Sequence, residues 1–403
     1  MSTIAYVGLP AHGHTNPSLP VIKELVNRGH TVHYYNAESF RPKITPTGAH
    51  FHPFPPPMPT EREIAEALHK FINASLIMSR MAAPLARFLI DTFTHNKPDL
   101  VIYDSAAMWG YVAARTHNIP NICFITTFVL DGSQSSIGYL NLARFFLESI
   151  RHIPKLLRWR RAMAQEFGSD NAAGLTAYAD CNIVFTSRDF HPPNNFIDDR
   201  FHFVGPSLDP QARDGHFPFD QLDPNRTTVY VSLGTINHLN PDFYRNLFTA
   251  FTDHPAQFIL AAGRTTNLND LGPIPPNFIV QNYVPQLDIL QRADYFITHG
   301  GMNSVHEGLY YGVPQIVIPN HFEQYLNGKQ VATVGAGRLI GTPRTYGQAT
   351  PDELRQALTT LSQNPSYHQN AQKIGQTLRD AGGYQRAATL IEQHLHTPLP
   401  IPS

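Results

Sequence analysis

Short apolar runs alternate with longer amphipathic stretches along the first half of the chain. The apolar runs predict strands at residues 4–9, 31–36, 100–103 and 121–126. Between the first two runs, residues 17–27 have helical periodicity and end at Arg28-Gly29, a common helix stop. Apolar strands joined by helices are typical of a parallel sheet that is covered on both faces. The first half is therefore predicted to be an α/β domain.

The same pattern restarts near residue 228. It predicts five more strands, at residues 229–233, 257–261, 278–281, 295–298 and 315–318. The halves also share residues in order, because AYVGLPAHGHTNP (5–17) parallels VYVSLGTINHLNP (229–241). This favours two similarly built, Rossmann-like, doubly wound domains. We expect their loops at the carboxyl ends of the strands to face each other across a ligand-binding cleft.

A proline-rich polar stretch separates the two halves. We therefore predict a first domain at residues 1–205, a linker at 206–225, a second domain at 226–380, and a C-terminal helix and tail at 381–403. Residues 383–395 have the pattern of one amphipathic helix, whose docking place the sequence does not specify.

Composition narrows the function classes. The 403 residues carry 30 basic and 31 acidic side chains, a net charge of -1 that gives no footprint for nucleic acid. No run of 18 apolar residues predicts a membrane span, and the N-terminus has no signal-peptide pattern. Two cysteines, Cys123 and Cys181, make neither a disulfide framework nor a four-ligand zinc site, which favours the cytoplasm. The histidines form no His-Glu-x-x-His motif and no spaced Cys/His set, and the His-x-His pairs at 12/14 and 394/396 are weak metal signals, so no metal site is expected.

The first strand-to-helix loop places a histidine where it can act as a base. Residues 8–15 have the spacing of a phosphate-binding loop, but His14 replaces its lysine and Pro10 removes a backbone donor. The dinucleotide motif Gly-x-Gly-x-x-Gly is also absent from this loop. A neutral imidazole on such a turn can accept a proton near pH 7. The alternative is that His14 or His12 only caps or packs the turn.

Asp104 ends a predicted strand in the same half. Its carboxylate could bond to His14 Nδ1–H, fix the tautomer and stabilise the imidazolium. The alternative is that Asp104 is the N-cap of the next helix.

The sharpest pattern in the second half is His299-Gly300-Gly301-Met302-Asn303-Ser304. Paired glycines let the backbone approach a ligand, and the following helix N-terminus suits a diphosphate. His299, Asn303 and Ser304 add donors, and Glu307 could hold a ribose diol. An ordinary glycine turn with an Asn/Ser cap is the alternative reading.

Three further loops follow predicted strands. Ser232, Gly234 and Thr235 offer hydroxyls and a glycine turn to a phosphate. Tyr283 could stack on a nucleobase whose edge the Val284 backbone reads. Glu323 and Gln324 are a carboxylate and an amide of the kind that sugar hydroxyls require.

At these residues the chain resembles the UDP-dependent glycosyltransferases of the GT-B fold, and most of all the bacterial macrolide glycosyltransferase-like members. The likeness extends from GHTNP (13–17) to AGGYQRAA (381–388), and residues 283–324 are its most specific part. The resemblance implies that His14 is the base and Asp104 its partner. It also implies which residues contact each part of the donor. Ser232 and Thr235 would contact the phosphate, and His299, Asn303 and Ser304 the diphosphate. Val284 and Gln286 would contact the uracil and the ribose, Glu307 the ribose, and Glu323 and Gln324 the donor sugar. It also places Thr126-Thr127 near the donor. Many members have Trp where this chain has Tyr283, whose ring offers less stacking area.

The expected activity is inverting transfer of a hexose, with glucose the expected sugar, from a UDP-sugar to a lipophilic alcohol such as a phenol, flavonoid or macrolide. No metal or cofactor beyond the donor is expected. The alternatives are a sugar-nucleotide epimerase and a non-catalytic nucleotide-sugar-binding protein. The basic run at residues 151–161 either contacts a membrane surface or an acidic acceptor, or is a solvated helix face.

Overall fold

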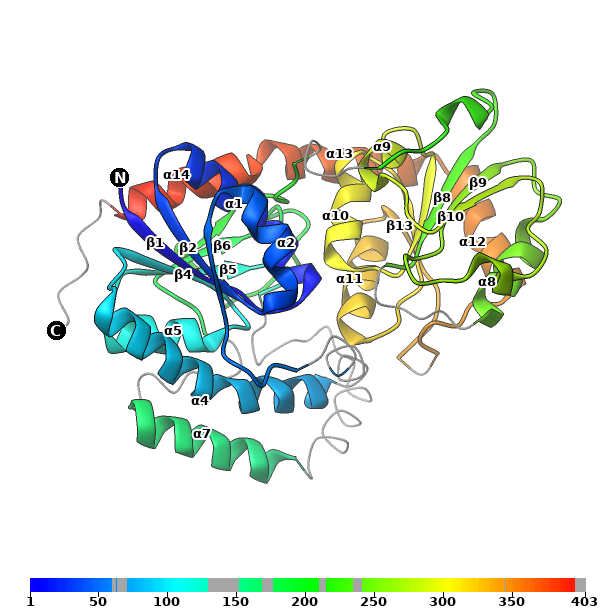
Figure 1. The fold of residues 1–403 in the computed structure, drawn as a ribbon. Helices are drawn as coiled ribbons and strands as arrows, with labels where there is room; N and C mark the ends of the chain where they lie inside the picture. Colours follow the sequence, from blue (N-terminus) through cyan, green and yellow to red (C-terminus); the bar gives the residue numbers. More distant parts are fainter. Residues whose placement is uncertain are drawn as a thin grey trace. The chain divides into compact units, whose positions relative to one another are not determined.

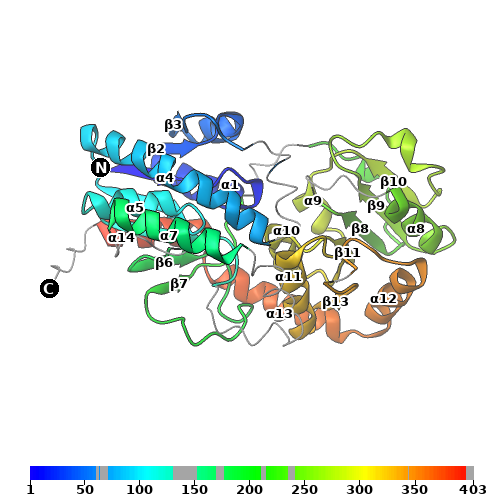
Figure 2. The same ribbon diagram turned by 90° about the horizontal axis from the view of Figure 1, so that it is seen from below.

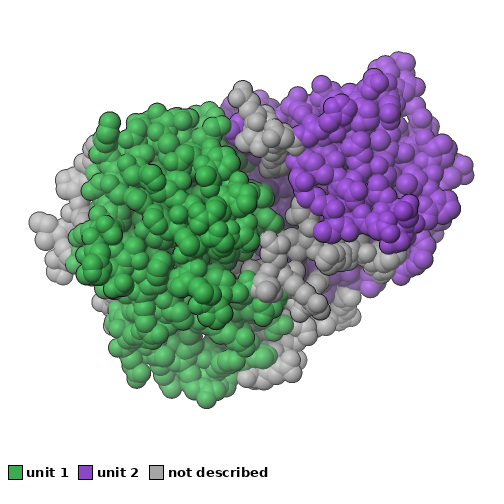
Figure 3. Space-filling view, in the orientation of Figure 1, with its two compact units in different colours: residues 1–187, 192–207, 381–403 green, residues 188–191, 208–380 purple. Residues whose placement is uncertain are grey.

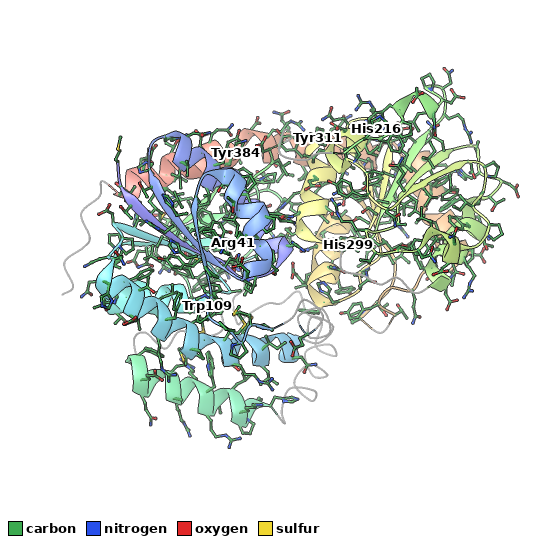
Figure 4. All side chains as sticks on the ribbon, viewed as in Figure 1. Arg41, Trp109, His216, His299, Tyr311 and Tyr384 are labelled. Atoms are coloured by element: carbon green, nitrogen blue, oxygen red, sulfur yellow. The ribbon has the colours of Figure 1, made fainter. Side chains whose placement is uncertain are left out.

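The computed structural model describes residues 1–59, 63, 71–129, 152–168, 177–209, 215–234, 241–343 and 345–395. The chain divides into two compact units, which Figure 3 colours separately. Unit 1 contains residues 1–187, 192–207 and 381–403, and unit 2 contains residues 188–191 and 208–380. Each unit has its own parallel sheet with helices on both faces, which confirms the predicted pair of Rossmann-like α/β domains (Figure 1).

The sheet of unit 1 has seven strands in the order β3-β2-β1-β4-β5-β6-β7, and all neighbours pair in parallel. The strands are β1 (Thr3–Val7), β2 (Thr31–Asn36), β3 (His50–Pro53), β4 (Leu100–Asp104), β5 (Asn121–Ile125), β6 (Cys181–Val184) and β7 (Phe201–Phe203). The strand order reverses direction between β1 and β4, so the loops after these two strands open a crevice at the carboxyl edge of the sheet.

Helices cover both faces of this sheet, as Figure 2 shows from below. They are α1 (His12–Asn27), α2 (Arg41–Ile44), α4 (Phe71–His95), α5 (Met108–Thr116), α7 (Ile153–Phe167) and α14 (Gly383–Leu395). Because side chains alternate along a strand, Ile4 and Tyr6 of β1 pack with α1 and α14. Ala5 and Val7 face the opposite way, toward α4 and α5.

The sheet of unit 2 repeats this order with six strands, β10-β9-β8-β11-β12-β13. The strands are β8 (Thr228–Ser232), β9 (Gln257–Ala261), β10 (Phe278–Gln281), β11 (Tyr295–Thr298), β12 (Gln315–Val317) and β13 (Gly337–Leu339). The helices are α8 (Pro241–Phe251), α9 (Gln286–Leu290), α10 (Met302–Tyr310), α11 (Phe322–Thr333), α12 (Pro351–Gln363) and α13 (Ser366–Asp380). The internal repeat in the sequence therefore corresponds to equivalent strands, β1 with β8 and β4 with β11.

The C-terminal helix α14 belongs to unit 1, although it follows unit 2 in the sequence. Its residues Ala387, Ala388 and Ile391 are buried in the core beside α1. An ion pair between Arg28 Nη1 and Glu392 Oε2 (2.7 Å) joins the two helices. This contact supplies the docking place that the sequence pattern did not specify.

Candidate active site

His14 and Asp104 meet at the carboxyl edge of the unit 1 sheet. The Nδ1 atom of His14 lies 2.8 Å from Asp104 Oδ2. The carboxylate is fully buried, whereas the His14 side chain is 19% exposed. The imidazole is therefore anchored on one side by a buried acceptor and remains accessible to small molecules. The sequence predicted these two side chains as partners from positions that are 90 residues apart.

His14 is in the helix that follows β1, and Asp104 is the last residue of β4, which is a hydrogen-bonded neighbour of β1 at the reversal of strand order. The other carboxylate oxygen, Asp104 Oδ1, accepts a hydrogen bond from the Ala106 backbone N–H (2.9 Å). This second bond fixes the side chain with Oδ2 directed at the imidazole. Asp104 is not the N-cap of the following helix, because α5 is preceded by Ala107.

His14 lies inside a helix rather than on the flexible turn that the sequence analysis expected. Helix α1 begins at His12, with Ala11 in an extended conformation at its N-cap, so His14 is in the first helical turn. The prediction placed the helix start at Pro17, because proline favours the first helical position. Instead Pro17 and Pro20 both lie within α1. A helix fixes the direction of the imidazole more firmly than a glycine turn would.

In unit 2, glycine lets the backbone make a tight turn after β11. Gly300 has a φ of +83°, a conformation that favours glycine. A Cβ atom there would lie 2.5 Å from Val317 Cγ1 and 3.0 Å from the Gln324 carbonyl oxygen. Gly301 is then the N-cap of α10, and it has no side chain that could cap this helix end. Its first-turn N–H groups and positive dipole end suit an anion.

The His299 ring is packed against two glycines of this edge. A Cβ atom on Gly234, which has a φ of +86°, would lie 2.8 Å from His299 Cε1, and one on Gly301 would lie 2.6 Å from Nε2. Burial lowers the pKa of His299 to about 4, although a hydrogen bond with the Ser232 backbone acts in the opposite direction. His299 is thus a neutral group near pH 7, and it joins the loop after β8 to the loop after β11.

Gln286 and Glu307 form a polar link between α9 and α10. Gln286 Nε2 donates to Glu307 Oε2 and, at 3.4 Å, to Ser304 Oγ, while the Tyr230 hydroxyl donates to Gln286 Oε1 (3.0 Å). Glu307 is fully buried, whereas Gln286 is partly exposed. Gln286 is therefore the more exposed member of this pair.

Tyr283 has a neighbour that the sequence analysis missed. The Arg264 guanidinium carbon lies 3.9 Å from the centre of the Tyr283 ring, in a cation–π contact. Asn282 holds the turn that carries Arg264, because its Nδ2 donates to the Gly263 and Thr266 carbonyls. The Val284 side chain is buried in the core, so only its backbone is left for recognition.

Helix α11, which follows β12, contacts the glycine turn. Asn327 Nδ2 donates to the Gly300 carbonyl (2.9 Å), which ties α11 to the turn. Glu323 is partly exposed in the first turn of α11. Gln324 is 6% exposed, and its Oε1 accepts from the Asn320 backbone N–H (2.8 Å). Glu323 is consequently the more accessible of the two residues predicted to hold a sugar.

The structure brings most of the predicted donor residues to one edge of unit 2. These residues lie at the end of β8 or in the loops and helices that follow β10, β11 and β12, and they are Ser232, Tyr283, Val284, Gln286, His299, Gly301, Asn303, Ser304, Glu307, Glu323 and Gln324. Thr235 lies outside the described residues. The sequence analysis missed Arg264 and Asn327. The one signal in the sequence is that both are polar residues in the segments that follow a predicted strand, β9 for Arg264 and β12 for Asn327.

The basic run lies on α7, apart from Arg151, which is outside the described residues. Its basic side chains are exposed, and the buried residue of the helix is Met163. Within the described ranges, no helix is long and apolar enough to cross a membrane. The same ranges hold no group of three His, Cys, Asp or Glu side chains that could bind a metal ion.

Comparison with known proteins identifies the family. Residues 247–381 match the family described as erythromycin biosynthesis protein CIII-like, C-terminal domain. A Bacillus subtilis (strain 168) protein, named as the uncharacterized UDP-glucosyltransferase YojK, is 33% identical over 97% of both chains. The oleandomycin glycosyltransferase of Streptomyces antibioticus is 29% identical over 97% of this chain and 90% of its own length.

A solved structure gives the same answer. The crystal structure of the glycotransferase of kitacinnamycin is 30% identical to this chain, with a TM-score of 0.81 over 98% of this chain and 99% of that one. Sequence relatives and structural neighbours along the whole chain thus agree on one family, and the chain belongs to the bacterial glycosyltransferases of the GT-B fold.

Proposed function

We propose that this glycosyltransferase moves a hexose, with glucose the expected sugar, from a UDP-sugar to a hydroxyl group of a lipophilic small molecule, with inversion at the anomeric carbon. The observation that carries the proposal is the 2.8 Å contact between His14 Nδ1 and the buried Asp104 carboxylate. A carboxylate at Nδ1 favours the tautomer with its proton on that atom. Nε2 then carries the free lone pair that a general base needs.

In the proposed reaction, His14 Nε2 takes the proton of the acceptor hydroxyl while its oxygen forms a bond to the anomeric carbon. The bond from that carbon to the UDP oxygen breaks, and UDP leaves with the electron pair. Asp104 stabilises the imidazolium that forms. The N-terminus of α10, whose N-cap is a glycine, receives the diphosphate charge, so the proposal needs no metal ion.

Donor recognition is proposed for the loops of unit 2. The glycine turn and α10 would bind the diphosphate, Gln286 the ribose, Tyr283 the nucleobase, and Glu323 the sugar hydroxyls. Ser232 would contribute to the diphosphate site from the end of β8. The names of the relatives support a nucleotide-sugar donor, because one is named as a UDP-glucosyltransferase.

The acceptor class is proposed from the relatives as well. Oleandomycin and kitacinnamycin appear in the names of two of them, and erythromycin biosynthesis in the name of the matched family. We therefore expect a natural product such as a macrolide, with phenols and flavonoids as test acceptors. The cytoplasmic location predicted from Cys123 and Cys181, both free thiols and buried in the structure, stays a prediction.

The test is to incubate the protein with UDP-glucose and a panel of phenols, flavonoids and macrolides. Mass spectrometry should detect acceptors that have gained one hexose, with one UDP released per product. A changed sugar nucleotide without acceptor product would indicate an epimerase, and UDP-glucose binding without turnover would indicate a binding protein. Either result would contradict the proposal.

His14→Ala is the decisive variant. It should abolish glycosylation of alcohols and leave UDP affinity within a few fold, since the proposed donor site is in the other unit. His12→Ala is the matched control, because His12 is in the same helical turn and contacts Lys43 Nζ (3.1 Å). Near-normal turnover in His14→Ala would remove the imidazole from the mechanism.

A further inference from the structure

A second oxygen atom faces the nitrogen of His14 that Asp104 contacts. Thr126 Oγ1 lies 3.0 Å from His14 Nδ1. Thr126 follows directly after β5 and is only 4% exposed. Three adjacent strands thus position one cluster: the imidazole comes from the helix after β1, the carboxylate from the end of β4, and the hydroxyl from the residue after β5.

The hydrogen atom on His14 Nδ1 determines whether the Thr126 hydroxyl donates to that nitrogen or accepts from it. His14 Nδ1 can hold one hydrogen atom, and the carboxylate at 2.8 Å can only accept it. With Nδ1 protonated, the Thr126 oxygen at 3.0 Å is a second acceptor of the same N–H group. An imidazole held by two acceptors from different strands has less freedom to rotate than one held by a single carboxylate.

We propose that Thr126 is a positioning residue for the catalytic base: it accepts from His14 Nδ1–H beside Asp104, holds the ring and stabilises its protonated form. This inference rests on the proposed function of His14. It differs from the role near the donor that the family resemblance implies for Thr126-Thr127, because the Thr126 hydroxyl contacts the His14 imidazole.

The charged and titratable groups around the cluster leave this assignment intact. On the sheet side, burial raises the pKa of Tyr6, Tyr34 and Cys123, and the Asp104 charge raises each further. These three groups therefore stay neutral across the working pH range. On the helical side, Lys43 contacts His12. Asp104 is the anion and Thr126 the neutral acceptor that meet His14 Nδ1.

The test compares Thr126→Val with Thr126→Ser. Valine removes the acceptor at nearly constant volume, so the imidazolium loses a partner and the base becomes weaker. The kcat should fall about three- to tenfold, and the acid limb of the kcat/KM profile should move about half a unit toward lower pH, while the KM for UDP-glucose is unchanged. Thr126→Ser keeps the oxygen and should restore the wild-type profile.

Thr127→Val is the matched control. This neighbour has the same side chain, but its hydroxyl donates to the Phe128 carbonyl (3.3 Å) and has no contact with His14 among those that the structure gives. It should leave the pH profile in place. An increased KM for the donor or a changed sugar preference in Thr126→Val, with the acid limb unmoved, would overturn the proposal and favour the donor role.

A second measurement does not depend on turnover. The ¹⁵N resonances of the His14 ring in the free protein should report a proton on Nδ1, and the titration midpoint should fall in Thr126→Val, or in Thr126→Ala if the valine variant folds poorly. An unchanged midpoint in a folded variant would refute the inference about Thr126. Turnover in His14→Ala would instead refute the proposed function, so the two failures are distinguishable.

Discussion

The two units have the same strand order around their reversal points but use the same edge in different ways. In unit 1, the carboxyl ends of β1, β4 and β5 and the segments after them present side chains, namely the imidazole of His14 with two oxygen acceptors. In unit 2, the loop after β11 presents backbone, because Gly300 and Gly301 have no side chains to fill the turn. The comparison teaches that the same topology places both edges, while the residue types there decide whether an edge offers a partly exposed imidazole or backbone N–H groups.

The largest expected effect tests the unit 1 edge. Asp104→Asn keeps the shape of the side chain but removes the charge and allows the wrong His14 tautomer. We expect kcat to fall roughly 10²-fold or more. UDP affinity, measured by calorimetry, should stay within a few fold. A comparable loss of UDP affinity would contradict the proposal that unit 2 alone binds UDP.

The corresponding change in unit 2 is Gly300→Ala. The new Cβ would meet Val317 Cγ1 at 2.5 Å in a residue with a φ of +83°, so the turn must shift. We expect UDP affinity to fall about tenfold or more, and the Tm to fall with it. Gly13→Ala is the matched glycine of unit 1, where the added Cβ meets nothing within 4 Å. Normal UDP affinity in Gly300→Ala would show that the turn does not contact the nucleotide.

A smaller effect is expected for Glu323→Ala. Because Glu323 is partly exposed in the first turn of α11, its loss should reduce discrimination between donor sugars more than it reduces UDP affinity. Ratios of kcat/KM for UDP-glucose, UDP-galactose and UDP-N-acetylglucosamine measure the discrimination. Equal losses for all sugars and for UDP itself would contradict a sugar contact.

Stability against pH should also depend on unit 2. Burial lowers the pKa of His306 to about 3, well below its value in the unfolded chain. Between about pH 6.5 and that value, the unfolded state binds the proton, so His306 reduces stability as the pH falls through this window. Denaturant titrations at pH 7 and pH 5 should show a smaller stability loss for His306→Phe than for the wild type. Equal stability losses in the variant and the wild type would show that His306 does not contribute to the pH dependence of stability.

The smallest expected effect is that of a chelator. Since the proposed diphosphate site uses the N-terminus of α10 in place of a metal ion, turnover should be unchanged by EDTA. If EDTA abolished activity and Mg²⁺ restored it, the N-terminus of α10 would not be sufficient to stabilise the diphosphate charge.

Much of the fold could be predicted because its strands are short apolar runs with clear ends. The strands at 31–36, 257–261, 278–281 and 295–298 have the predicted bounds. The start of α1 was wrong because Pro17 has the signal of a first helical residue, while the true start at His12 has no side-chain cap to mark it. Local sequence cannot show that a helix continues through two prolines.

The candidate site was predictable where function depends on position after a strand. His14 and Asp104 could be paired because each follows a strand at the reversal point. The contact of Thr126 with His14 could not, since it depends on how adjacent loops close over the sheet. The complete burial of Glu307 and its hydrogen bond with Gln286 on another helix were equally hidden. Such contacts arise from packing between segments that are distant in the sequence, and the hydrophobic periodicity of the sequence does not indicate them.

The return of α14 to unit 1 has a consequence for biosynthesis. Unit 2 is almost continuous in sequence, and all of its residues have been made once Asp380 is added. Unit 1 still lacks Ala387, Ala388 and Ile391, which fill its core beside α1, until the ribosome has added the last helix. The half of the protein that is translated first is therefore completed last, and a ribosome that stalls before α14 leaves an apolar surface on the nascent chain uncovered.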